Sequence, residues 1–256
     1  MTEADLLAAL PGLAFAFVLV LCRVGTAVML IPGLGEAELP PTVRAGFAVA
    51  LTLFVLPGVA SLVPAAGEDW SGAGMVGAEL LTGAVLGWLA RLPALALSMA
   101  GAIISYFLGL SSVLQPDPAL GGQSTALARL FGLVAPVLIL ATGLYALPLS
   151  ALVGSYAVVG PGGVLPSGSV AEILVKVASE SLGLALQLSA PFLLAGFVWQ
   201  VAMGLLARLV PQLQVYSAAA PGQILGGLVL LSLLAARLLG AWADGVSASW
   251  AALPGS

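Results

Sequence analysis

Long apolar runs alternate along the chain with short breaks that are rich in proline, glycine or charged residues. A helix that crosses a membrane needs about 20 predominantly apolar residues. Three of the runs are longer than 30 residues. The pattern therefore predicts about six apolar helical segments. The runs are 6–31, 43–59, 75–114, 125–159, 170–210 and 218–243.

Proline interrupts the longest runs and leaves two interpretations open. The run 75–114 contains Arg91-Leu92-Pro93, and the run 170–210 contains Pro191. Each run is about twice the length that one span needs. Because proline removes a helical hydrogen bond and often kinks a helix, each run is either two spans or one long kinked helix.

Composition places the chain in a membrane. Hydrophobic residues make up 61% of it, charged residues only 7%, and the mean hydropathy is +1.17. A soluble domain carries about 25% charged residues, so too little polar surface is present here to cover a globule in water. We therefore expect an all-α integral membrane protein whose broken segments form helical hairpins, as one membrane-embedded domain over 1–256.

The segment from Gly101 to Phe131 has an unusual centre. Two prolines flank Asp117, so the preceding helix is expected to stop near Gln115 and a new one to start at Ser124, a good cap residue. Gly101, Ser105 and Gly109 recur every four residues, which predicts a flat helix face for close packing. The intervening loop is either an ordinary aqueous connection or a plug at the mouth of a pore.

Charged residues inside the apolar runs are candidates for function, because charge is costly at membrane depth. Arg23 has Glu36 or Glu38 as a candidate partner, and Arg208 is expected to pair with a carboxylate or with carbonyls freed at the next break. Glu79 could serve as a proton relay, but a single acid near the start of a run is more often solvated, so we expect Glu79 to face water.

A second polar pattern lies in the run 170–210. Its polar residues fall at spacings of four, four and seven, which places them on one face of a helix. The stripe is either a set of first turns that projects into water or a polar face toward a partner or a pore. Its members are Glu172, Lys176, Glu180 and Gln187.

Catalytic and cofactor-binding patterns are missing. The sequence has no histidine, a single cysteine (Cys22) and no phosphate-binding loop. We therefore expect no enzyme activity, no metal and no cofactor, and the absence of a basic patch argues against nucleic acid as a partner. The acidic N-terminus lacks the positive region of a signal peptide, so the first apolar run is expected to be retained.

Three stretches in order resemble a known family. They are Arg23-Val-Gly with Ile31-Pro-Gly-Leu-Gly-Glu36 and Val43-Arg44; Gly109-Leu110-Ser111 with Asp117-Pro118; and Gly204-Leu-Leu-Ala-Arg208-Leu-Val-Pro211-Gln-Leu-Gln214. Together they resemble the flagellar biosynthesis protein FliR family, membrane components of the type III secretion export gate. The similarity covers nearly the whole chain.

The resemblance implies a function and a place. Family members join FliP-like and FliQ-like subunits, contact other export-apparatus proteins and lipid, and form the channel for unfolded flagellar subunits in the bacterial inner membrane, at the flagellar basal body. By position, the family's plug loop is 109–122. The implied plug residues are Gly109, Leu110, Ser111, Ser112, Val113, Leu114, Gln115, Pro116 and Asp117. The implied motif and assembly residues are Arg23, Pro32, Gly33, Glu36, Pro40, Arg44, Gly101, Ser105, Arg208, Pro211 and Gln212.

Some positions depart from the family pattern. Gln200 stands where an acidic residue is usual, Gln223 where a lysine is usual, and Gly143-Leu-Tyr145 where a Gly-His pair is common. These differences affect expected polar contacts with partners. Two other functions stay open: a secondary transporter or channel for small solutes, and the equivalent subunit of a virulence injectisome.

Overall fold

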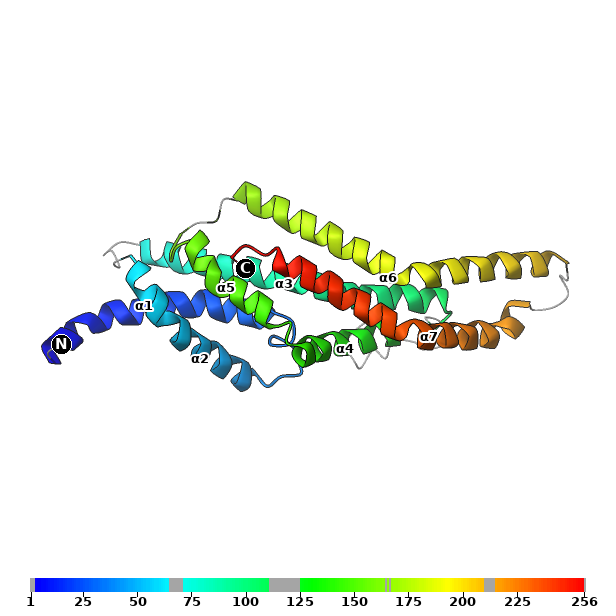
Figure 1. The fold of residues 1–256 in the computed structure, drawn as a ribbon, viewed down its shortest axis with the longest axis horizontal. Coiled ribbons are helices and arrows are strands. Elements are labelled where there is room, and N and C mark those ends of the chain that lie inside the picture. The colour runs from blue at the N-terminus through cyan, green and yellow to red at the C-terminus, as the bar shows by residue number, and fades with distance from the viewer. Residues whose placement is uncertain are drawn as a thin grey trace. The chain divides into compact units, whose positions relative to one another are not determined.

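In the computed structural model, the described residues are 3–64, 71–110, 125–163, 165, 167–209 and 215–255. They form helices and turns, and no strand occurs in these ranges, which confirms the all-α prediction. The elements are α1 (Glu3–Leu30), α2 (Pro41–Val59), the 3-10 helix η1 (Ala60–Leu62), α3 (Ser71–Phe107), α4 (Ala126–Thr142), α5 (Ala146–Val158), α6 (Ser167–Leu209) and α7 (Val215–Ala251) (Figure 1).

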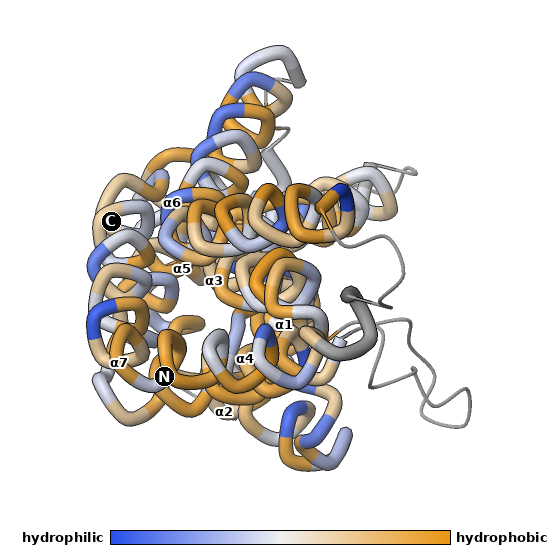
Figure 2. The backbone as a smooth tube through the Cα atoms, turned by 90° about the vertical axis from the view of Figure 1, so that its right-hand side faces the viewer, coloured by the Kyte–Doolittle hydropathy of each residue, from blue (hydrophilic) through white to orange (hydrophobic). Residues whose placement is uncertain are grey.

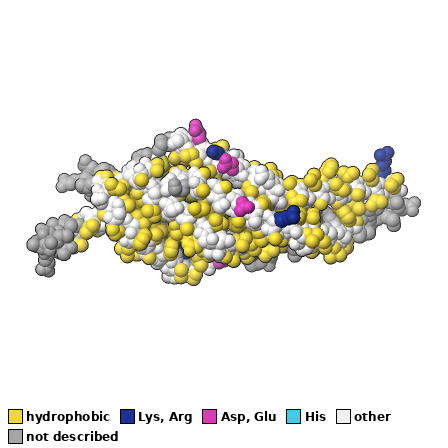
Figure 3. All heavy atoms as spheres, viewed as in Figure 1, with side chains coloured by type: hydrophobic (Ala, Val, Ile, Leu, Met, Phe, Trp, Pro, Cys, Tyr) yellow, Lys and Arg dark blue, Asp and Glu magenta, His cyan; other side chains and the backbone are white. Residues whose placement is uncertain are grey.

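Five of these helices are long and apolar enough to cross a membrane, and the bent pair α4–α5 would make a sixth span, counting the described ranges only. Hydrophobic residues dominate the tube along most of the helices (Figure 2). The face shown in Figure 3 is likewise mostly hydrophobic and carries only scattered charged side chains. A surface of this kind requires lipid or other apolar protein around it, in agreement with a multi-pass membrane protein.

The two longest apolar runs are single helices. The helix α3 continues through Pro93 and α6 continues through Pro191, so the interpretation of one long helix is confirmed for both. Proline at position 93 removes the helical donor of the Leu89 carbonyl. Close by, the indole of Trp250 donates a hydrogen bond of 3.0 Å to the Ala90 carbonyl, which ties the end of α7 to α3.

The run 125–159 is broken by glycine and not by its prolines. The axes of α4 and α5 differ by 74°, and the break between them contains Gly143 with φ of +76°. Glycine adopts this left-handed conformation without the steric cost that a Cβ would bring. Pro136 lies inside α4, and Pro148 lies in the first turn of α5, where a missing N–H costs little.

The end of α3 differs from the prediction. The helix ends at Phe107, and Gly109 follows with φ of +71°, so the expected stop near Gln115 is eight residues too late. Glycine in this conformation is a common helix terminator, and it acts here before the prolines are reached. At the start of α4, the hydroxyl of Thr125 accepts the Ala128 N–H at 3.3 Å, so Thr125 is the observed cap. Ser124 lies outside the described residues.

The helices form two compact units: residues 1–92, 138–177 and 247–256 make the first, and residues 93–137 and 178–246 make the second. Four helices contribute to both, so the single-domain prediction stays a prediction. In the first unit the fully buried core includes Leu19, Val20, Val24, Ala27 and Val28 on α1, Leu89 and Ala90 on α3, and Trp250 on α7. In the second the core includes Leu97, Ala100, Ile104, Ala185, Phe192, Trp242 and Val246.

Candidate functional site

A fully buried ion pair lies at the centre of the first unit. Arg23 on α1 and Glu79 on α3 both have side chains that are 0% exposed. The Arg23 Nε donates to Glu79 Oε2 at 2.7 Å, and Nη2 donates to Oε1 at 2.9 Å. This two-point contact fits the planar guanidinium to the planar carboxylate, the strong geometry for such a pair. It links two helices across a separation of 56 residues.

The remaining donors of Arg23 bind the end of α5. Its Nη1 donates to the Ser155 hydroxyl at 3.2 Å and to the Val159 carbonyl at 2.9 Å, and Nη2 donates to the Gly160 carbonyl at 3.4 Å. An arginine side chain has five N–H donors. All five therefore have acceptors, and the positive charge lies beside the carbonyls at the C-terminus of a helix, where it is favourable.

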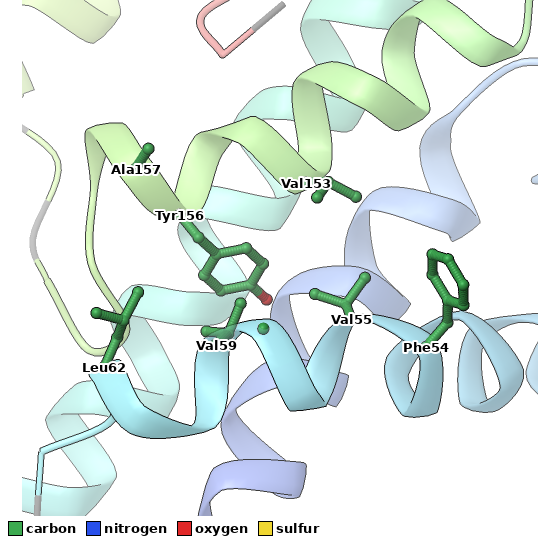
Figure 4. A pocket seen from close by; sticks show the side chains of 8 residues that line it. Phe54, Val55, Val59, Leu62, Val153, Tyr156 and Ala157 are labelled. Carbon is green, nitrogen blue, oxygen red and sulfur yellow. The ribbon is translucent and has the colours of Figure 1, made fainter.

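Two more groups complete this buried arginine centre. The Gly162 N–H donates to Glu79 Oε1 at 2.6 Å, so the carboxylate also holds the turn after α5. The ring of Tyr156 lies 4.1 Å from the guanidinium carbon, a cation–π distance. The same ring lines an apolar hollow of about 340 Å³ between α2 and α5. Figure 4 shows the ring beside other lining residues, among them Phe54, Val55, Val59 and Val153.

Glycines let the backbones come close enough for this centre. A Cβ on Gly83 would collide with the Arg23 carbonyl oxygen, and one on Gly87 would lie 2.6 Å from Leu30 Cβ. The two glycines are four residues apart on α3 and form the small-residue face that close helix crossings use. Gly162 has φ of +74°, which allows its N–H to reach Glu79.

The structure corrects two expectations about charges. Arg23 pairs with Glu79 and not with Glu36 or Glu38, and Glu79 is buried instead of facing water. The reason is tertiary: Glu79 lies one turn before Gly83, where α1 and α3 are in contact, so it meets Arg23 across that crossing. Burying a charge is strongly unfavourable unless an opposite charge and hydrogen bonds compensate it, and here both are present.

Glu36 instead takes part in a second, partly exposed cluster that closes the end of α1. Arg91 Nη2 lies 3.4 Å from Glu36 Oε2, and Arg91 Nη1 donates to the Leu30 carbonyl at 3.2 Å. Glu36 also accepts the Gly33 N–H at 3.3 Å, and Gly33 has φ of +86°. The buried Pro32 and these residues thus form the turn after α1, in which cation and carboxylate satisfy groups at a helix end.

The start of α2 carries two other residues of the family motif. Pro40 precedes the helix with φ of −55° and ψ of 137°, and its carbonyl accepts the N–H groups of Val43 and Arg44 at 3.0 and 3.2 Å. The Arg44 Nε is buried and has no hydrogen-bond partner among the described residues. Pro40 therefore acts in helix initiation, and Arg44 presents a donor that this part of the chain does not use.

In the second unit, the small-residue face of α3 lies against α4. A Cβ on Gly101 would lie 2.9 Å from the Ala128 Cα and 2.9 Å from the Leu127 carbonyl oxygen. Ser105, one turn later, is 0% exposed, and its hydroxyl has no partner among the described residues. The backbone contact predicted from the spacing is thus observed at Gly101, whereas Gly109 lies beyond the end of the helix.

We expect Ser105→Leu to prevent normal folding or assembly. A leucine side chain has no space at a fully buried position beside this crossing, and overpacking of this kind costs about 1–3 kcal/mol. The measurement is the amount of protein recovered in a detergent-stable complex with its partners. Ser105→Ala is the matched control, because it removes a hydroxyl that forms no bond within the described residues. Normal recovery of the leucine variant would contradict the prediction.

The end of α3, where the predicted plug begins, is also well defined. Gln223 on α7 donates from Nε2 to the Phe107 carbonyl at 2.9 Å, and Gly109 and Leu110 form the turn that follows. The other plug residues, 111–117, lie outside the described residues.

The late motif is described in part. Arg208 is exposed in the last turn of α6, and no ion-pair partner for it occurs in the described part of the chain. Pro211 and Gln212 lie outside that part. The proposed pairing of Arg208 therefore stays a prediction.

The polar stripe at positions 172, 176, 180 and 187 lies on α6, and all four residues are exposed.

Sequence reasoning missed several members of the buried arginine centre. The Gly83–Gly87 pair is a GxxxG pattern and could have been recognised as a close helix contact. Ser155, Tyr156 and Gly162 carry no such signal, because ordinary small or aromatic residues in an apolar run do not reveal which distant charge they meet. The centre neutralises its own charges, and its chemistry is that of a structural junction between three chain segments.

Together the fold and this junction define a class: an all-helical, multi-pass membrane protein whose helices are joined by an internal ion pair. Comparison with known proteins identifies the family. Residues 14–248 match the family model described as bacterial export proteins, family 1. The chain therefore belongs to this family of bacterial export proteins.

Three curated relatives are similar over most of their length. The flagellar biosynthetic protein FliR of Caulobacter vibrioides is 33% identical over 227 residues, which cover 88% of this chain and 90% of the relative. FliR of Bacillus subtilis is 27% identical, with 84% of each chain covered. The Yop proteins translocation protein T of Yersinia pestis is 27% identical over 70% of this chain and 69% of its own. The sequence-based assignment to the FliR family is thus confirmed.

Proposed function

We propose that the protein is a membrane subunit of the type III protein export gate of the bacterial flagellum. The observation that carries this proposal is the family match over residues 14–248 together with the FliR relatives. The apolar helices support a location in a membrane, and the similarity to FliR supports placing it in the bacterial cytoplasmic membrane at the flagellar basal body. The role proposed is structural and translocating, with no chemical reaction performed by the chain and no cofactor.

The exposed apolar surface supports assembly with other subunits. The candidate membrane spans in α6 and α7 are 42 and 33 residues long, and only 17% and 11% of their apolar windows is buried. A simple span needs about 20 residues, so helices of this length extend beyond the hydrocarbon unless they tilt. Their apolar surface outside the hydrocarbon then needs other proteins to cover it. We propose that FliP-like and FliQ-like subunits cover much of this surface and that the assembled channel conducts unfolded export substrates.

Within that assembly, we propose that residues 109–122 form the plug. The segment is rich in small, polar and proline residues, so it has little bulk with which to lock itself in place. Leu110, Val113 and Leu114 would supply an apolar seal, and Gly109 and Gly121 would act as hinges. The left-handed backbone at Gly109 supports this role for its first end, because glycine changes such angles at low cost.

Native purification tests the proposal against a self-sufficient transporter. The tagged protein is extracted from its own membranes in mild detergent, and the mass of the complex and its components are measured. An export-gate subunit is expected to co-purify with FliP-like and FliQ-like proteins, and deletion of its gene is expected to abolish motility. A monomer or homo-oligomer that purifies alone from motile cells would contradict the proposal.

An injectisome is the second candidate, since protein T of Yersinia is also similar. The flagellar assignment is favoured because the Caulobacter FliR matches more of the chain at higher identity. Loss of motility in the deletion strain distinguishes the two.

A further inference from the structure

The last turn of α3 is closed by a regular hydrogen-bond pattern that does not reach the carbonyl of Phe107. The Leu110 N–H donates to the Ser105 carbonyl at 3.0 Å, and the Gly109 N–H donates to the Tyr106 carbonyl at 3.2 Å. With Gly109 at φ of +71°, these bonds form a Schellman motif. The motif satisfies the carbonyls of Ser105 and Tyr106. The carbonyl of Phe107 is the next one along, and neither of these bonds reaches it.

A side chain from α7 supplies the donor for that carbonyl. Gln223 Nε2 lies 2.9 Å from the Phe107 oxygen, and a Cβ on Gly109 would lie 3.4 Å from the same amide group. Gln223 is half-buried in a small hollow between α3, α6 and α7. It therefore binds the helix end and also lies against the glycine at which the chain changes direction.

Two glycines, Gly196 and Gly227, leave room for the side chains of Phe107 and Leu108 beside this bond. A Cβ on Gly196 of α6 would lie 2.8 Å from the Phe107 Cβ, and a Cβ on Gly227 of α7 would collide with the Leu108 side chain. Leu108 is only 4% exposed. The end of α3 is thus fitted between two glycine-lined backbones, and the Gln223 amide adds a directional bond to this apolar contact.

We propose that Gln223 is a positioning residue that holds the last turn of α3, residues 107–110, in one orientation. The effect on a closed gate rests on the proposed function, in which the plug begins at Gly109. A neutral hydrogen bond of this kind shifts an equilibrium by about 2- to 10-fold. That strength favours one orientation of the helix end and still lets the bond break and re-form each time the gate opens.

Three replacements separate the hydrogen bond from the volume of the side chain. Gln223→Leu keeps a similar size but has no donor, and Gln223→Glu keeps the shape but, when ionised, presents only acceptors to the Phe107 carbonyl. Gln223→Lys retains a donor and is expected to rescue. Gln187→Leu makes the same chemical change at an exposed position of α6 and serves as the matched control.

The first measurement does not depend on gating. Spin labels are placed at Leu110 and Leu228 in a chain that carries Cys22→Ala, and the distance distribution is recorded in the purified complex. Gln223→Leu and Gln223→Glu are expected to broaden the distribution or add a second distance, whereas Gln223→Lys and Gln187→Leu keep the parent's. An unchanged distribution in the leucine and glutamate variants would overturn the inference. If the leucine variant does not assemble, the glutamate and lysine variants decide.

The second measurement is ion leak through the assembled gate in the same variants. A leak that rises about 2- to 10-fold in the variants with a broadened distribution is the expected result and supports both proposals. A broadened distribution without a leak would leave Gln223 as a positioning residue and would contradict the plug at 109–122. A leak without broadening would overturn the role of Gln223.

Discussion

Arg23→Leu is expected to remove most of the folded protein from the membrane, and Glu79→Leu is expected to do the same. Either change leaves a fully buried charge without its partner, and breaking such a pair costs about 3–5 kcal/mol. The net stability of a folded protein is about 5–15 kcal/mol, so the loss is a large part of it. Arg23→Leu also leaves the Ser155 hydroxyl and the end of α5 without the donors that bind them.

The double variant Arg23→Leu/Glu79→Leu tests this explanation. Because no unpaired charge remains, its protein level and melting temperature in detergent are expected to exceed those of either single variant. Arg91→Leu is the matched control: the Arg91–Glu36 pair is 25% and 19% exposed and 3.4 Å long, so its loss should cost about 1 kcal/mol or less. Single variants as stable as the parent would show that the buried pair is dispensable.

Deletion of Ser111–Gln115 is expected to leave the complex assembled but to make the membrane leaky to ions and small solutes. The deletion removes Val113 and Leu114, which are proposed to seal the pore. It spares the Gly101 contact with α4 and the Gln223 contact with α3, so the packing of the described helices is retained. A plug that a passing chain must displace makes few buried contacts, and its loss should therefore cost little stability.

The measurement is ion or solute flux in cells that express the complete gate, with complex assembly checked by co-purification. A second variant replaces Val113 and Leu114 by serine at constant loop length, which separates loss of the apolar seal from shortening of the loop. An assembled deletion complex as tight as the parent would mean that this stretch is an ordinary connection and that the seal lies elsewhere.

Much of the helical architecture follows from hydropathy, whereas the exact helix ends do not. The apolar runs predict the spans because burial in lipid is decided by composition over about 20 residues. The breaks depend on single backbone conformations. Pro93 and Pro191 lie inside continuous helices. In contrast, Gly109 and Gly143, both with positive φ, lie just after the ends of α3 and α4. Hydropathy does not distinguish these two cases.

The candidate site was predictable only where its signal is local. The four-residue spacing of Gly101 and Ser105 predicts a close contact, and Gly101 makes one with α4. The partner of Arg23 was not predictable, because Glu79 is 56 residues away and several other carboxylates, Glu36 and Glu38 among them, are nearer in sequence. Pairing across helices is set by which faces cross, and that is a tertiary property.

The members of the buried arginine centre lie far apart in sequence, and this separation affects how the protein is inserted into the membrane during synthesis. Arg23 leaves the ribosome 56 residues before Glu79 and 132 residues before Ser155. At about 5–20 residues per second, α1 waits roughly 3–11 s for its carboxylate. During that interval the nascent α1 carries an uncompensated cation and is a poor substrate for release into lipid. We therefore expect the first helix to stay beside the translocation machinery until α3 arrives, and the rate of synthesis between these two residues to influence how much protein is correctly inserted.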